Sequence, residues 1–228
     1  MSLTSLTLYE QALLLIASLV LFTSFLMLAQ ARLFTLIRVF AWQGGLLAVT
    51  TALVALVLGH PHLYLSALLT LVLKAMLIPW MLHRLVIRLN VHREVESLMY
   101  SPLVLMMGAT LVVFSYYVAL PIVHLSALVI RNTIAVSLVV VLLGMLLMIS
   151  RRQAVAHVVG FMSIENGLLF AAVVSTYGMP MVVELGIAFD VLVAAVLFGV
   201  FFFQIRESID SLDVDRLNRL HELGEIEE

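Results

Sequence analysis

Long apolar stretches separated by short polar breaks dominate the pattern of this chain. Seven stretches approach the roughly 20 mostly apolar residues that a helix needs to cross a bilayer. They cover 8–28, 39–58, 63–82, 102–120, 127–149, 154–176 and 181–203. Continuous apolar runs of this length favour helices over β-barrel strands, in which polar and apolar residues alternate. The pattern predicts an all-α polytopic membrane protein with about seven transmembrane helices.

Composition excludes a soluble enzyme. Of 228 residues, 64% are hydrophobic and 11% charged, whereas soluble domains carry about 25% charged residues. The absence of cysteine excludes disulfides, thiolate zinc sites and Cys-ligated iron–sulfur clusters. His60 and His62 flank a proline and are interpreted as a turn, since no third metal ligand is evident. We therefore expect no cofactor, no metal and, without a basic patch, no nucleic-acid partner.

The basic residues predict the orientation. Ten of the twelve Lys and Arg residues fall in breaks on one side of the predicted membrane or in the C-terminal segment. Cytoplasmic loops carry such an excess of Lys and Arg, so the pattern places the N-terminus outside and the C-terminus in the cytoplasm. We expect a multi-pass protein of the cell (inner) membrane, and we interpret 8–28 as a retained span rather than a signal peptide.

Three regions follow along the chain. Residues 1–126 form an N-terminal membrane region of four helices with a cytoplasmic loop at 83–101, and 127–205 form a three-helix membrane region. The segment 206–228 holds eight acids against three arginines, with Leu and Ile at helical spacing. Anionic lipid repels such an acidic helix, so docking on a protein is one interpretation and a solvated tail the other.

Three ionisable residues fall near the predicted bilayer midplane on three different helices. At 1.5 Å per residue, Lys74 lies roughly 17 Å below the outer end of its span, and Glu165 and Asp190 lie at similar depth. A lone charge there costs about 2.5–3.5 kcal/mol on insertion scales. Burial favours the neutral form of each group and an opposite charge favours the ionised form, so such groups can bind and release protons. The alternative is a purely structural ion pair between Lys74 and one of the acids.

Neighbouring residues support a functional interpretation. Pro79 cannot donate to the carbonyl of Ala75, so a kink is expected beside Lys74. Asn166 adjoins Glu165. Gly160 and Gly167 are seven residues apart, hence on one helix face, and allow another helix to approach closely.

Three more ionisable residues lie nearer the membrane boundaries. Glu184 is close to the outer boundary and continues the predicted proton route from Asp190. Arg131 lies a turn inside the fifth span and His157 near the cytoplasmic end of the sixth. We interpret Arg131 and His157 chiefly as interfacial anchors.

The stretch from Arg151 to Gly167, with Glu-Asn-Gly at 165–167, resembles component E of hydrogenase-4, a membrane subunit of formate hydrogenlyase-type complexes. Glu-Leu-Gly-Ile-Ala-Phe-Asp at 184–190, the tail at 211–215 and the Lys-to-Pro stretch at 74–79 fit the same family. The region 127–205 is also similar to complex I subunit K and to the C subunit of multisubunit cation/proton antiporters. Aligned on Gly160, the subunit K glutamate falls at Met162, and Asp190 is likewise displaced by about a turn.

The resemblance implies a membrane subunit of a complex I-like hydrogenase that contributes to proton translocation or coupling, with Lys74, Glu165, Asp190 and Glu184 as the relay. Its implied partners are antiporter-like subunits, a quinone-site-like membrane anchor subunit and, through the tail, a cytoplasmic redox arm. Two alternatives remain: a non-conducting scaffold, or a subunit of a related complex I-like or antiporter assembly. No inverted repeat or broken-helix pair favours a free-standing transporter.

Overall fold

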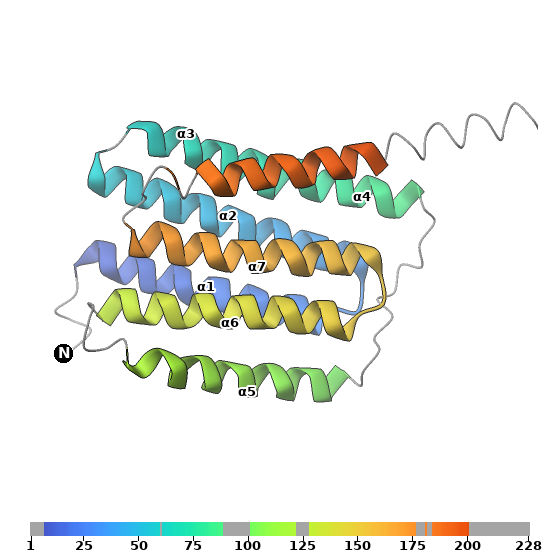
Figure 1. The fold of residues 1–228 in the computed structure, drawn as a ribbon, viewed down its shortest axis with the longest axis horizontal. Helices are drawn as coiled ribbons and strands as arrows, with labels where there is room; N and C mark the ends of the chain where they lie inside the picture. The colour runs from blue at the N-terminus through green and yellow to red at the C-terminus, as the bar shows by residue number, and fades with distance from the viewer. Residues whose placement is uncertain are drawn as a thin grey trace, which may run out of the picture.

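The computed structural model describes residues 7–59, 61–88, 101–121, 128–176, 181 and 184–200. These residues form a bundle of long helices running roughly parallel and antiparallel to one another (Figure 1). The helices are α1 (Leu8–Ala29), α2 (Leu33–Leu58), α3 (Pro61–Thr70), the π-helix η2 (Leu71–Leu77), α4 (Ile78–Arg88), α5 (Ser101–Ala119), α6 (Leu128–Ser150) and α7 (Ala154–Ser175). A further helix covers 184–200 and is called the 184–200 helix below.

The predicted all-α membrane architecture is confirmed. Within the described residues, six helices are long and apolar enough to cross a membrane, α3, η2 and α4 forming one of them. The 184–200 helix lies inside the predicted seventh stretch. The molecule is therefore a membrane protein. The predicted tail at 206–228 lies outside the described residues.

Two predicted boundaries were wrong. Helix α2 begins at Leu33, so Arg38 is helical, and α4 continues to Arg88, so 83–88 are helical rather than the start of a loop. Hydropathy predicts where the chain leaves the apolar interior of the membrane, but the helix can continue beyond that point. Here Leu85 and Val86 are buried while Arg84 lies over the Trp80 ring, 5.2 Å from its centroid.

Local signals set several helix ends. Thr7 and Glu10 form a capping box at the start of α1, in which the Thr7 N–H donates to Glu10 Oε2 at 2.8 Å. Helix α2 ends at Gly59, whose φ of 68° lies in the left-handed region that favours glycine.

Helices α2 and α6 are the centres of packing. Helix α6 packs against α7, α1 and α5, while α2 packs against α1, α7 and the α3–η2–α4 rod. The 184–200 helix lies beside that rod and α7. A large buried cluster of Leu, Val, Ile, Phe and Met side chains joins most of these helices.

The two ends of the bundle differ. The α1–α2 and α6–α7 turns and the end of α4 share one end, and the α2–α3 turn and the start of α1 share the other (Figure 1). At the first end, Arg151 Nη2 donates to the carbonyls of Leu28 (2.7 Å) and Gln30 (3.1 Å). Burial lowers the pKa of the Arg151 guanidinium, but the ordinary value is so high that the group stays charged. A cation thus satisfies the C-terminal carbonyls of α1, where the helix dipole favours positive charge.

Candidate functional site

Lys74 lies in the distorted middle of a membrane helix. Residues 71–77 form a π-helix, and the N–H of Ile78 bonds to the carbonyl of Leu73, five residues earlier. The expected distortion beside Pro79 thus takes the form of a widened turn, because Pro79 has no N–H to continue the regular ladder. Pro79 itself is buried.

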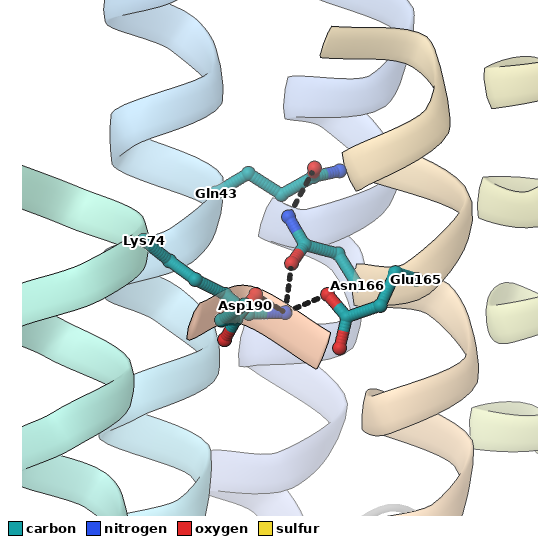
Figure 2. A network of polar contacts seen from close by, with 5 residues as sticks. All are labelled: Gln43, Lys74, Glu165, Asn166 and Asp190. Carbon is teal, nitrogen blue, oxygen red and sulfur yellow. Dashed lines mark hydrogen bonds and ion pairs between the residues drawn. The ribbon is translucent and has the colours of Figure 1, made fainter. Parts of the chain in front are cut away.

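Two other helices, α7 and the 184–200 helix, bring polar side chains to the Lys74 ammonium (Figure 2). Lys74 Nζ donates to Glu165 Oε2 and forms a salt bridge with it. It also donates to Asn166 Oδ1 at 2.8 Å and lies 3.4 Å from Asp190 Oδ1. We call Lys74, Glu165, Asn166 and Asp190 the Lys74 cluster. The three charged residues predicted near the midplane therefore meet at one point.

An amide chain extends the cluster toward α1. Asn166 Nδ2 donates to Gln43 Oε1 at 3.0 Å, and Gln43 Nε2 donates to Ser24 Oγ at 2.8 Å. Ser24 in turn donates to the Val20 carbonyl of its own helix. Gln43 and Asn166 are fully buried, so this chain fixes both amides and holds Asn166 Oδ1 toward Lys74.

The charges of the cluster do not balance when all groups are ionised. One ammonium faces two carboxylates, which leaves one excess negative charge in an apolar interior. Lys74 and Asp190 have no exposed surface, and the Glu165 side chain is 13% exposed. An uncompensated buried charge is expensive, so one bound proton would neutralise the site. Among the described residues, no group of three His, Asp or Glu side chains could hold a metal ion.

Glu165 also borders an apolar groove on the surface. The groove, about 360 Å³ in volume, lies between α7 and the 184–200 helix, and its walls include Phe161, Leu168, Leu185 and Phe189. Glu165 is the charged residue in this lining. The cluster therefore has one carboxylate at its rim and one, Asp190, fully enclosed.

Glycines position the helices that carry the cluster. A Cβ added to Gly160 would lie 2.6 Å from Met148 Cγ, and one added to Gly167 would lie 2.9 Å from the Ser137 carbonyl oxygen, so both glycines face α6. Gly44 of α2 faces η2, where an added Cβ would lie 2.8 Å from Lys74 Cβ. The backbone of α2 thus sets the position of Lys74.

The structure does not bring the other predicted residues into the cluster. Glu184 is exposed near the start of the 184–200 helix. His157 is half-buried, and its Nδ1 bonds to the Gln153 carbonyl at 2.9 Å, one turn earlier in the chain. Arg131 lies near the start of α6, and its side chain is outside the described part of the structure.

Sequence reasoning missed Gln43, Gly44 and Ser24. The signal was present for the first two, since a glutamine followed by two glycines interrupts an otherwise apolar span. An uncharged amide costs less in a membrane than a charge does, so it did not stand out. Ser24 carried no signal, because serines that bond to their own helix are common in membrane helices.

The amino-acid sequence of this chain is similar to those of several known proteins. It is 31% identical over 188 residues to "Uncharacterized protein Rv0085" of Mycobacterium tuberculosis, a match covering 82% of this chain and 86% of the relative. It is 27% identical over 126 residues to "Hydrogenase-4 component E" of Escherichia coli K12 and of Shigella flexneri. These matches cover 55% of this chain and 58% of the relative.

No protein-family model matches the chain, and no solved structure matches it. The match to the mycobacterial protein spans most of both chains, whereas the match to hydrogenase-4 component E covers little more than half of each. The chain therefore belongs to the family of the mycobacterial protein Rv0085, and it is distantly similar to hydrogenase-4 component E.

Proposed function

We propose that this protein is a membrane subunit of a hydrogenase-type complex and that its Lys74 cluster carries protons during energy coupling. The similarity to hydrogenase-4 component E supports the assignment to such a complex. The apolar helices support a membrane location. The geometry of the cluster supports the proton-handling role.

One observation carries the proposal: Lys74 contacts two carboxylates from two other membrane helices in a site almost closed to solvent. Paired with one ammonium, two carboxylates reach neutrality only by sharing one proton. A proton added to or removed from this site changes its net charge inside an apolar medium. Such a change has a large electrostatic consequence, because charges interact strongly where the effective dielectric constant is low.

Glu165 acts as the central carrier in this proposal. It lies between the apolar groove and Lys74, so it can exchange a proton with a group outside the chain and with the enclosed Asp190 inside. When Lys74 moves toward Asp190, Glu165 loses its counter-charge and binds a proton. When Lys74 returns to Glu165, the Glu165 O–H bond breaks and its proton passes to Asp190, which has then lost the counter-charge. The π-helical turn that carries Lys74 is the element that would allow such a movement.

The predicted topology completes the proposal. The N-terminus lies outside, the arginine-rich turns and the C-terminus lie in the cytoplasm, and the membrane is the cell inner membrane. Antiporter-like subunits, a membrane anchor subunit and, through 206–228, a redox arm are the partners. Residues 1–126 and 127–205 form its two membrane regions, with Glu184 extending the route on the outer side.

The test is proton translocation per turnover in the assembled complex. Glu165→Gln keeps the size and polarity of the side chain but cannot carry a proton, and Lys74→Met removes the counter-charge. We expect normal assembly with lost translocation in Glu165→Gln, and lost translocation in the fraction of Lys74→Met that assembles. Glu10→Gln is the matched control, since Glu10 caps α1 near the membrane boundary, away from the cluster. Unchanged translocation in both cluster variants would contradict the proposal.

A scaffold role is the second candidate. Lys74 connects η2 with α7 and the 184–200 helix, and Asn166 connects α7 with α2, so the cluster could serve only to hold helices together. In that case Glu165→Gln, which retains a hydrogen-bond acceptor for Lys74, keeps translocation intact, and Lys74→Met prevents assembly.

A further inference from the structure

Two buried hydroxyl groups beside the Lys74 cluster differ from the other described hydroxyls of the bundle. Most serine and threonine side chains here donate to a carbonyl one turn earlier in their own helix, as Thr51 does to Leu47 and Ser137 to Thr133. Thr70 Oγ1 and Ser163 Oγ have no hydrogen-bond partner within the described part of the chain. Both residues are fully buried.

Both hydroxyls lie one helical turn from a member of the cluster. Thr70 precedes Lys74 by four residues, and Ser163 precedes Asn166 by three. Residues at these spacings are neighbours on a helix surface. Thr70 therefore lies on the same side of its helix as Lys74. Ser163 lies between Asn166 and the glycine face of α7, since Gly160 and Gly167 face α6.

The two hydroxyls lie on opposite sides of the cluster along the bundle axis. Thr70 lies toward the Pro61 end of its rod, and Ser163 toward the Ala154 end of α7. These helix ends are at opposite ends of the bundle (Figure 1). A line from Ser163 through the cluster to Thr70 therefore runs along the bundle axis and covers about one helical turn on each side of the cluster.

Asp190 adds a third buried group without a full set of partners. Its Oδ1 lies 3.4 Å from Lys74, and neither carboxylate oxygen has a hydrogen bond within the described residues. A buried polar atom without a partner is costly, and native proteins satisfy such atoms with ordered water when protein groups do not. A bound water needs two to four polar partners, and hydroxyl and carboxylate oxygens provide them.

We propose that Thr70 and Ser163 are water-binding, proton-transfer groups that extend the Lys74 cluster by one helical turn toward each end of the bundle. In each transfer, a hydroxyl accepts a proton from a water on one side and releases its own to a water or carboxylate on the other. The O–H bonds formed and broken balance, and the hydroxyl is unchanged. This proposal rests on the proposed function, because it assumes that the cluster exchanges a proton.

The test is hydrogen–deuterium exchange at the cluster in the full chain in lipid nanodiscs. Infrared spectroscopy monitors the exchange. A protonated carboxyl group gives a C=O band that shifts when its proton is replaced by deuterium. Glu165→Gln and Asp190→Asn assign that band to the cluster. We expect Thr70→Val and Ser163→Ala to slow its shift in heavy water by about tenfold or more, as for loss of a positioned proton-transfer group.

Matched controls separate this effect from packing. Thr51→Val and Ser137→Ala remove buried hydroxyls that bond to their own helices, and exchange stays unchanged in both. Thr70→Ser retains the hydroxyl and restores fast exchange, which also tests the inference if Thr70→Val fails to fold. Equal slowing in the controls would attribute the effect to packing and overturn the inference.

The outcomes for the two proposals are distinguishable. Exchange that is unchanged in Thr70→Val and Ser163→Ala, with the carboxyl band present, overturns the inference and leaves the proposed function standing. Absence of any exchangeable carboxyl band in the unsubstituted chain contradicts the proposed proton site, and with it this inference.

Discussion

Helix α7 contacts its neighbours through two faces that are held together in different ways. On one face, Gly160 and Gly167 allow the backbone of α6 to approach, and Gly144 of α6 faces back toward Ile164 and the Gly160 carbonyl. On the other face, Glu165 and Asn166 form hydrogen bonds and an ion pair with residues of η2 and α2. The first contact depends on small residues and the second on polar ones.

Of these two contacts, only the polar one can change its state. The glycines at the close contact between α6 and α7, Gly144, Gly160 and Gly167, carry no titratable group, so this contact provides a fixed support. The polar face depends on where one ammonium lies and on how many protons two carboxylates hold. A proton can therefore change the second interface without disturbing the first. The following substitutions test that division.

Lys74→Met gives the largest expected loss of stability. Removing one partner of a buried ion pair costs about 3–5 kcal/mol, because the other charge stays buried and unpaired. Adding Glu165→Gln and Asp190→Asn to Lys74→Met should recover most of the loss, since the carboxylates that need the ammonium are gone. Unfolding in detergent measures both variants. A loss under about 1 kcal/mol would show that the ion pair does not hold the polar face.

Gly160→Ala tests the packed face. The new Cβ would lie 2.6 Å from Met148 Cγ and 3.0 Å from the Gly144 carbonyl oxygen, and such overpacking costs about 1–3 kcal/mol. The infrared band of the protonated carboxyl should stay unchanged. Gly199→Ala is the control, as an added Cβ there has no atom within 4 Å. A changed carboxyl band in Gly160→Ala would show that the two faces are coupled.

Gly44→Ala tests the support of the polar face. Its Cβ would lie 2.8 Å from Lys74 Cβ and 3.0 Å from the Lys74 carbonyl carbon. We expect a loss of about 1–2 kcal/mol, together with a shifted carboxyl band because Lys74 is displaced. The neighbouring Gly45→Ala should be neutral or stabilising, since nothing lies within 4 Å of that Cβ. Equal effects of the two variants would contradict the role assigned to Gly44.

The hydrogen bond between Asn166 and Gln43 should contribute less. A double-mutant cycle with Asn166→Leu and Gln43→Met should give a coupling energy of about 0.6 kcal/mol, typical of polar contacts between membrane helices. Unfolding of the single and double variants measures it. Asn166→Leu combined with Thr51→Val should be additive, because Thr51 bonds to its own helix. Additivity in both cycles would show that the hydrogen bond between Asn166 and Gln43 does not stabilise the polar face.

Glu184→Gln should have the smallest effect. Glu184 is exposed, so its loss should change the free energy of unfolding by less than about 0.5 kcal/mol. The carboxyl band of the Lys74 cluster should also stay unchanged. Proton translocation in the assembled complex then tests whether the route continues through Glu184. A shifted band would show that Glu184 interacts electrostatically with the Lys74 cluster and would contradict this prediction.

Hydropathy could predict the helices because each span must bury a long apolar surface in lipid and satisfy its backbone internally. It could not predict that α2 begins at Leu33 or that α4 continues to Arg88. The amphipathic end of α4 stays helical because its apolar side packs on the bundle and its arginines reach water.

The positions of Lys74, Glu165 and Asp190 in the sequence are enough to place them at one depth, since depth follows from position along a helix of fixed rise. The sequence also predicts that Pro79 must disturb the helix beside Lys74. That the three charged side chains meet could be learned only from the fold, because rotation about each helix axis depends on packing between helices. The same packing places Gly44 against Lys74, brings Gln43 into the site and leaves Glu184 exposed. Those contacts link residues far apart in the chain, so no local pattern contains them.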